Sequence, residues 1–171
     1  MLSVKKQQYE KRQHMKDARI ITKRLCRIFF CGALAVTAFI FYQSCKSMDE
    51  SGATSSALMA LLKPIFDPNN RIPVEVFHHY LRKTAHFVEF CALGICWGVY
   101  AWQRGVLKGR RYAAMPMLLT LATAVADEYL QYFTHRGSAV TDVVLDYSGA
   151  LTGLAVVYLI SLCVRWIQKR A

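Results

Sequence analysis

Five carboxylates of this chain lie inside or at the edge of long apolar segments. They are Glu89, Asp127, Glu128, Asp142 and Asp146. A carboxylate in a membrane span costs ~2.5–3.5 kcal/mol on insertion scales, so such groups persist where they pair, face a cavity or take part in a reaction. Basic or amide side chains stand close to them in sequence, namely Arg82, Lys83, His86, Gln131 and Arg136.

These residue types fit three kinds of chemistry. In acid–base catalysis, Glu89 or Asp127 would be the general base and His86 the acid or nucleophile. The predicted catalytic residues are His86, Glu89, Asp127 and Glu128. In anion binding, cationic side chains would hold a phosphate. The predicted substrate-binding residues are Arg82, Lys83, Gln131, Arg136, Asp142 and Asp146. The third possibility is a divalent metal, since imidazole and carboxylate groups are metal ligands. Its predicted ligands are His86, Glu89, Asp127 and Asp142.

Helical spacing places these residues on shared faces. Arg82, His86 and Glu89 follow the spacing i, i+4, i+7, and Asp142 and Asp146 lie one turn apart. Asp127 and Glu128 each lie within about one turn of Gln131. The same geometry therefore predicts three polar helix faces.

The composition indicates a membrane protein. Apolar residues make up 54% of the chain and charged residues 19%, and the apolar residues are blocked into runs. Four runs are near the ~20 residues that a spanning helix needs. They are residues Leu25–Ser44, Thr84–Trp102, Ala113–Phe133 and Val143–Trp166. We therefore predict an all-α, polytopic bundle of four transmembrane helices, with the first span retained as an anchor because no cleavable signal sequence precedes it.

The distribution of Lys and Arg predicts the orientation. Basic residues crowd the N-terminal segment, the connection between the second and third spans, and the C-terminal tail, whereas the connection between the third and fourth spans carries only Arg136. The positive-inside rule then places both termini in the cytoplasm of a multi-pass plasma-membrane protein. Residues 1–24 form a basic cytoplasmic extension, expected to lie as a polar helix on the inner membrane surface or to act as a simple topogenic flank. Residues 25–167 form the transmembrane domain and 168–171 the cytoplasmic tail.

The external loop, residues 45–83, is expected to be mixed in structure. SCKSMDESGATSS is loop-like by composition. ALMALLKPIF could form a short interfacial helix or a partial re-entry, and Pro64 would end or kink it. DPNNRIP predicts turns, and a helix is expected from Val74 onwards.

The predicted topology brings the three polar faces to one depth. Each set falls roughly 0–10 Å below the outer surface at 1.5 Å per residue. We therefore expect a shared cavity open to the outside, with Arg136 over it. Gly149 and Gly153 would let another helix approach closely just below the acids.

Two other function classes are disfavoured. The net charge of +11 is explained by membrane orientation, and no nucleic-acid-binding motif accompanies it. The six cysteines form no C-x-x-C and fit small packing residues better than a metal or disulfide framework.

The polar motifs resemble those of VanZ-like membrane proteins. RKTAHFVEFCALG, from Arg82 to Gly94, is similar to the motif R-K-x-x-H-x-x-E-[YF]-x-x-L-G, and DEYLQYFTHRGSAVTDVVLDYSGALTG, from Asp127 to Gly153, resembles the family's second polar motif. FYQSCKSMDES is similar to its serine-rich segment after the first helix, so the resemblance covers approximately residues 39–160. Two departures are Asp146, where the family often has Asn, and the turn Thr-His-Arg at 134–136, where it usually has Pro-Gly-Arg.

The resemblance implies a polytopic plasma-membrane protein, commonly bacterial and Gram-positive, whose founding relative is linked to teicoplanin resistance. Four functions stay open. The cavity could catalyse a reaction on an anionic lipid-linked substrate, or bind and mask a cell-wall precursor or lipoglycopeptide. The polar contacts could serve structure alone, for example between Arg82 and Glu89 or between Gln131 and Asp146. Transport is the fourth, and a homo-oligomer would suit it. Membrane lipids are expected partners in each case.

Overall fold

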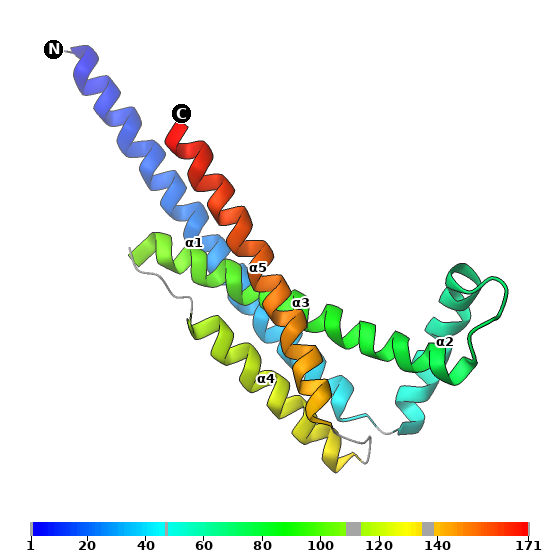
Figure 1. Ribbon diagram of the computed structural model, residues 1–171. Helices are drawn as coiled ribbons and strands as arrows, with labels where there is room; N and C mark the ends of the chain where they lie inside the picture. Colours follow the sequence, from blue (N-terminus) through cyan, green and yellow to red (C-terminus); the bar gives the residue numbers. More distant parts are fainter. Residues whose placement is uncertain (1, 47, 109–113, 135–138, 171) are drawn as a thin grey trace.

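The protein is built from five helices in the computed structural model, which describes residues 2–46, 48–108, 114–134 and 139–170 (Figure 1). Within these ranges there is no strand. The helices are α1 Leu2–Ser44, α2 Met48–Phe66, α3 Val74–Lys108, α4 Ala114–Phe133 and α5 Val140–Arg170. The all-α prediction is therefore confirmed, as is the start of a helix at Val74.

α3 and α5 are in the most extensive contact of any helix pair, and at two glycines of α5 their backbones approach with no side chain between them. A Cβ added at Gly149 would lie 2.4 Å from the carbonyl oxygen of Phe87, and one at Gly153 would lie 2.2 Å from that of Cys91. Real Cβ atoms do not come so close to backbone, so glycine is required at both positions. The predicted close approach at Gly149 and Gly153 is confirmed, and α3 is the helix that approaches.

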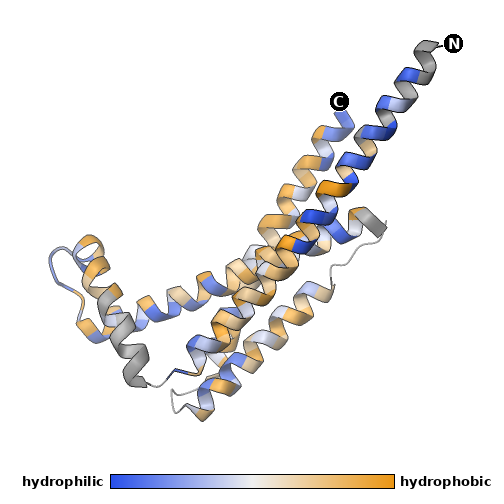
Figure 2. Ribbon diagram, turned by 180° about the vertical axis from the view of Figure 1, so that it is seen from behind, coloured by the Kyte–Doolittle hydropathy of each residue, from blue (hydrophilic) through white to orange (hydrophobic). Residues whose placement is uncertain are grey.

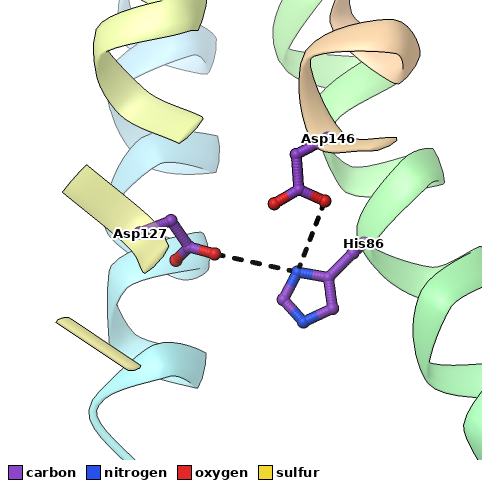
Figure 3. Close-up of side chains that lie close together, drawn as sticks. All are labelled: His86, Asp127 and Asp146. Atoms are coloured by element: carbon purple, nitrogen blue, oxygen red, sulfur yellow. Dashed lines mark ion pairs between the residues drawn. The ribbon is translucent and has the colours of Figure 1, made fainter. Parts of the chain in front are cut away.

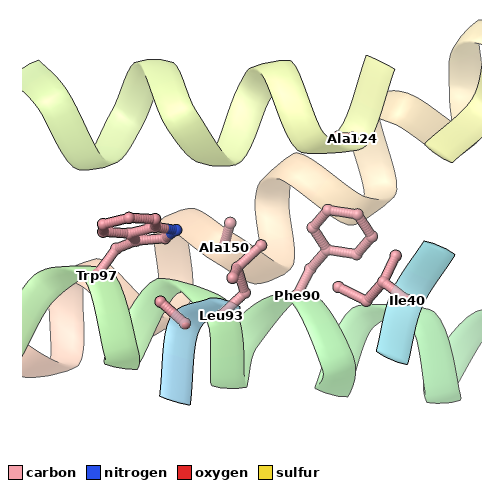
Figure 4. Packing of buried hydrophobic residues seen from close by; sticks show 7 residues of the cluster. Ile40, Phe90, Leu93, Trp97, Ala124 and Ala150 are labelled. Carbon is pink, nitrogen blue, oxygen red and sulfur yellow. The ribbon is translucent and has the colours of Figure 1, made fainter. Parts of the chain in front are cut away.

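A small apolar core joins four of the helices (Figure 4). It lies mainly along α3 and is completed by residues of α1, α4 and α5. Its buried members are Ala33, Ile40, Phe90, Leu93, Trp97, Ala124 and Ala150. Large apolar side chains such as Leu118, Val144 and Leu159 point outward and are exposed. An apolar exterior around a modest core is what helices surrounded by lipid require.

Among the described residues, three helices are long and apolar enough to cross a membrane. They are Met15–Ser44, Val74–Val106 and Val140–Arg170. α4 coincides with the predicted third span but is not one of the three. It has 20 residues, so its length suffices. Its last turns carry Asp127, Glu128 and Gln131, and these polar side chains lower its mean hydropathy.

The N-terminal extension is continuous with the first span. α1 runs without a break from Leu2 to Ser44, so residues 2–24 do not form a separate helix lying across it. In Figures 1 and 2 this hydrophilic part projects beyond the bundle, and the N- and C-termini lie at the same end of the molecule. A helix holds its direction where no Pro or Gly interrupts it, and residues 2–24 contain neither.

The segment between α1 and α3 is more helical than its composition suggests. The loop expected for SCKSMDESGATSS, residues 44–56, is wrong from Met48 onwards, where α2 begins. α2 continues to Phe66, two residues beyond Pro64. The local preference of Ser, Thr and Gly against a helix is weak, and α2, which contacts α3, forms in spite of it.

The predicted turn before α3 is confirmed. The Asp67 carboxylate accepts hydrogen bonds from the backbone N–H groups of Arg71 at 2.8 Å and Ile72 at 2.9 Å. Asn70 adopts a left-handed φ of 49°, which Asn tolerates better than most residues. Asp67 thus orders the turn that leads into α3.

Candidate functional site

Three helices bring one polar side chain each to a common point at the end of the bundle opposite the two termini (Figures 1 and 3). His86 comes from α3, Asp127 from α4 and Asp146 from α5. The His86 Nδ1 atom lies 3.8 Å from Asp127 Oδ2 and 4.0 Å from Asp146 Oδ1. Polar residues as far as 60 positions apart in the chain therefore share one site.

Asp127 is the most enclosed member of the site. Its side chain is fully buried. Oδ1 accepts a hydrogen bond from the Ser44 hydroxyl, and Oδ2 accepts one from Gln131 Nε2 at 2.9 Å. Both carboxylate oxygens are therefore held in place, as burial of a charged group requires.

Ser44 is a site residue that sequence reasoning missed. It is the last residue of α1 and is fully buried. Besides donating to Asp127, it accepts a hydrogen bond at its carbonyl oxygen from the Thr134 hydroxyl at 3.2 Å. The available signal was its position at the outer end of the first predicted span, level with the acids of the other spans.

Asp146 is buried but less completely satisfied. Its side chain is 2% exposed, and its Oδ2 atom has no hydrogen-bond partner among the described residues. The structure places Gln131 against Asp127, so the expected Gln131–Asp146 contact is not the one that forms. Asp146 therefore has capacity for a further ligand.

Glu128 of α4 forms a hydrogen bond with the backbone at the start of α5. Its carboxylate accepts a hydrogen bond at 3.1 Å from the backbone N–H of Ala139, the residue just before α5. Arg82 is close enough to attract this carboxylate. Glu128 thus combines a structural contact with a place in the wall of the pocket.

A salt bridge between Lys83 and Asp142 lies at the more open part of the site. The two side chains are 32% and 21% exposed, so water reaches both. Such a pair is worth little for stability, with a median of about 0–1 kcal/mol. Its position matters more, because it places a cation and an anion beside the buried residues.

These side chains enclose a small, partly open pocket. It is lined by Arg82, Lys83, His86, Glu128, Gln131, Asp142, Leu145 and Asp146. Seven of the residues predicted from sequence thus line one pocket. Asp127 is not in the lining but accepts a hydrogen bond from Gln131, which is. Leu145 is the one apolar member.

One further predicted site residue stands apart from this lining. Glu89 lies one turn further along α3 than His86, half-buried and near enough to Asp146 for their negative charges to repel. Arg136 lies outside the described residues, so its predicted place over the cavity stays a prediction. His86, Asp127 and Asp146 form a group of potential metal ligands, and Glu89 and Asp142 of the predicted ligand set are not in it among the described residues.

The pocket can support two kinds of chemistry. An imidazole between two buried carboxylates can exchange a proton or hold a cation. Arg82 and Lys83 can donate to a phosphate or carboxylate group entering from the open side. The acids in and behind the wall outnumber these two cations, so an anionic ligand would need one of the acids to be neutralised.

The comparisons with known proteins agree with the membrane fold. A model of the VanZ/LLP1 family matches residues 29–161, which is more than three quarters of the chain and includes every residue of the described site. Searches of the curated proteins and of the solved structures each found no match. Family membership and the three apolar helices together indicate a membrane protein. The chain belongs to the VanZ/LLP1 family and is a membrane protein of the VanZ type.

Proposed function

We propose that this protein binds the anionic head group of a lipid-linked or cell-wall precursor at the outer surface of the plasma membrane. The observation that carries the proposal is the pocket in which Arg82 and Lys83 stand beside His86 and the buried acids. By this binding the protein would contribute to tolerance of lipoglycopeptides such as teicoplanin, or to homeostasis of the cell envelope.

The proposal includes a topology of four spans with both termini in the cytoplasm. The basic N-terminal part of α1 and the C-terminal end of α5 lie at one end of the molecule, and the end of α4 and the start of α5, which carry residues of the pocket, lie at the other (Figure 1). The positive-inside rule puts the basic end in the cytoplasm and hence the pocket on the outer side. α4 completes the bundle as the fourth span, with its polar turns turned towards the pocket rather than towards lipid.

Head-group recognition would follow from the arrangement of charges. Lys83 is partly exposed and Arg82 lines the same wall, so both can reach a phosphate without either being fully desolvated. The apolar exterior of α4 and α5 lies alongside for the lipid tail. Binding of this kind needs complementarity and no reaction.

A second candidate function is catalysis on the same ligand. It is favoured by the His86 imidazole, which lies within 4.0 Å of two buried carboxylates and could move a proton during attack on a phosphate or ester. Asp127, held by Ser44 and Gln131, would orient the imidazole and stabilise its charged form.

Incubation of the purified protein with a polyprenyl phosphate, or with a lipid-linked peptidoglycan precursor, separates these functions. Mass spectrometry would follow both the retained lipid and any change in its mass. We expect saturable retention of the phosphorylated lipid and none of the matching polyprenol. An altered lipid would establish the catalytic function instead. Equal retention of the phosphate and the alcohol would contradict head-group recognition.

A further inference from the structure

The geometry points to a divalent metal site formed by His86, Asp127 and Asp146. Each residue offers one ligand atom, and these three atoms lie within 4.8 Å of one another. Zinc binds imidazole nitrogen and carboxylate oxygen at about 2.0–2.2 Å, which separates neighbouring ligands by roughly 3–3.5 Å. The separations of 3.8 and 4.0 Å from His86 Nδ1 to the two carboxylates would therefore shorten by about half an ångström on binding, and a pair as far apart as 4.8 Å by roughly 1–2 Å. Side-chain rotation provides a movement of that size.

The second observation is the unsatisfied oxygen of Asp146. Its Oδ2 atom is buried and lacks a hydrogen-bond partner among the described residues, although the side chain is 2% exposed and lines the pocket. Leaving a buried acceptor unsatisfied is costly, and more so for a charged group. A cation in the pocket would remove that cost.

The charge balance favours a cation at this point. Lys83 neutralises Asp142, and Arg82 is placed to neutralise Glu128. Asp146 then faces His86 with no Lys or Arg paired to it in the described part of the chain, and Asp127 lies close to the same imidazole. A divalent ion would offset both carboxylates, and the donor set of one imidazole and two carboxylates suits Zn²⁺ or Mn²⁺.

The surroundings of Asp127 resemble those of a metal ligand. Ser44 holds Oδ1 and Gln131 holds Oδ2, so the carboxylate is oriented from outside the site. Ordered partners of this kind fix the position of metal ligands and raise metal affinity. Oδ2 has a second lone pair with which it could bind an ion while accepting from Gln131.

The metal would also explain how an acidic pocket accepts an anionic head group, and this step rests on the proposed function. Three protein ligands leave coordination positions open, as in other zinc sites that bind substrate or water. A phosphate oxygen could occupy such a position while Arg82 and Lys83 bind the remaining oxygens.

Metal content of the purified full-length protein tests the site. After chelation and removal of the chelator, the protein would be equilibrated with Zn²⁺, and bound zinc would be measured by mass spectrometry of the element. We expect one ion per chain, and at least a tenfold loss of affinity in His86→Gln and Asp146→Asn. The matched control is Asp142→Asn, one turn away on α5 and paired to Lys83, which should keep the ion. Equal affinity in Asp146→Asn and the wild type would overturn the site.

A measurement on the wild type avoids dependence on how the variants fold. Pulsed electron paramagnetic resonance of the Mn²⁺ form should show one directly bound imidazole nitrogen, and its absence would contradict the proposal. Lys83→Gln separates the two hypotheses, because it should keep the metal and lose the polyprenyl phosphate. Lipid phosphate binding without any metal would overturn the metal site alone. Metal binding without lipid phosphate binding would overturn the head-group proposal alone.

Discussion

α3 and α5 meet in two regions with different roles, a close backbone contact at two glycines and a polar pocket. Around Gly149 and Gly153 the two backbones touch, and added Cβ atoms would lie 2.2–2.4 Å from carbonyl oxygens of α3. One turn towards the start of α5 from Gly149, His86 and Asp146 face each other across 4.0 Å and line a pocket. The glycine region fixes the distance between the two helices. That distance sets how far His86 and Asp146 lie from each other in the polar region. The site is therefore positioned by residues that carry no functional group.

The largest expected effect comes from adding one methyl group to the glycine region. In Gly153→Ala the new Cβ would meet the backbone of Cys91, so α3 and α5 must move apart. We expect a loss of at least about 3 kcal/mol in the free energy of unfolding, at the upper end of overpacking effects. Thermal unfolding in detergent would measure it.

Gly32→Ala is the matched control for that change. Its Cβ would lie 3.5 Å from Cys96 Sγ, an ordinary contact, and alanine favours a helix over glycine by up to about 1 kcal/mol. This variant should unfold at the same temperature as the wild type or higher. Equal destabilisation by the two substitutions would refute the distinction between the glycine contacts.

Substitutions in the polar region should affect function rather than folding. We expect Glu89→Gln and Asp127→Asn to abolish activity at unchanged membrane levels. In Asp127→Asn an amide N–H₂ replaces one of the oxygens that accept from Ser44 and Gln131, and the negative charge beside His86 is lost. Teicoplanin tolerance at matched expression is the measurement, with Asp67→Asn as a control outside the bundle. Wild-type tolerance in both variants would show that the polar region is not a functional site.

A smaller effect is expected from the salt bridge at the mouth of the pocket. A double-mutant cycle with Lys83→Gln and Asp142→Asn should give a coupling of about 0.2–1 kcal/mol, because both side chains are partly exposed. Added salt should weaken the coupling. A coupling of several kcal/mol that salt leaves unchanged would mean that the pair is buried and belongs to the structural contacts.

The smallest effect concerns the turn before α3, outside both regions. Hydrogen bonds from the backbone N–H groups of Ile72 and Arg71 lower the pKa of the Asp67 carboxyl. The carboxylate therefore stabilises the turn above its unfolded pKa of about 3.9, and this contribution is lost as the pH falls through the lower folded value. As the pH falls through that range, exchange of the Arg71 and Ile72 amide hydrogens in the wild type should become faster in comparison with the same amides in Asp67→Asn. Equal pH dependence in the variant would contradict the role of Asp67.

Helix faces, the glycine contact and two helix ends could be predicted from the sequence. Helical periodicity correctly grouped Arg82 with His86 and Asp142 with Asp146, because a regular helix fixes which residues share its face. It also identified Gly149 and Gly153 as a close-packing surface. The ends of α1 at Ser44 and of α4 at Phe133 followed from the length of the apolar runs.

Contacts between helices could not be derived in this way. Gln131 lies within a turn of both acids of α4, and its bond to Asp127 rather than to Asp146 depends on how α4 packs beside α5. Ser44 carries no charge and lies 83 residues from Asp127, so its role becomes visible when α1 is placed against α4. The helix at Met48 and the continuity of α1 likewise reflect packing and cooperativity over local composition.

Accessibility of the pocket from the outer surface is the most direct test of the account. Leu145 lines the pocket, so Leu145→Cys, in a background without the six native cysteines, places a single thiol there. On intact cells this thiol should react with a membrane-impermeant reagent, and a polyprenyl phosphate should protect it while the polyprenol does not. Labelling that requires permeabilised cells, or that the phosphate leaves unchanged, would contradict an outward-facing site for anionic head groups.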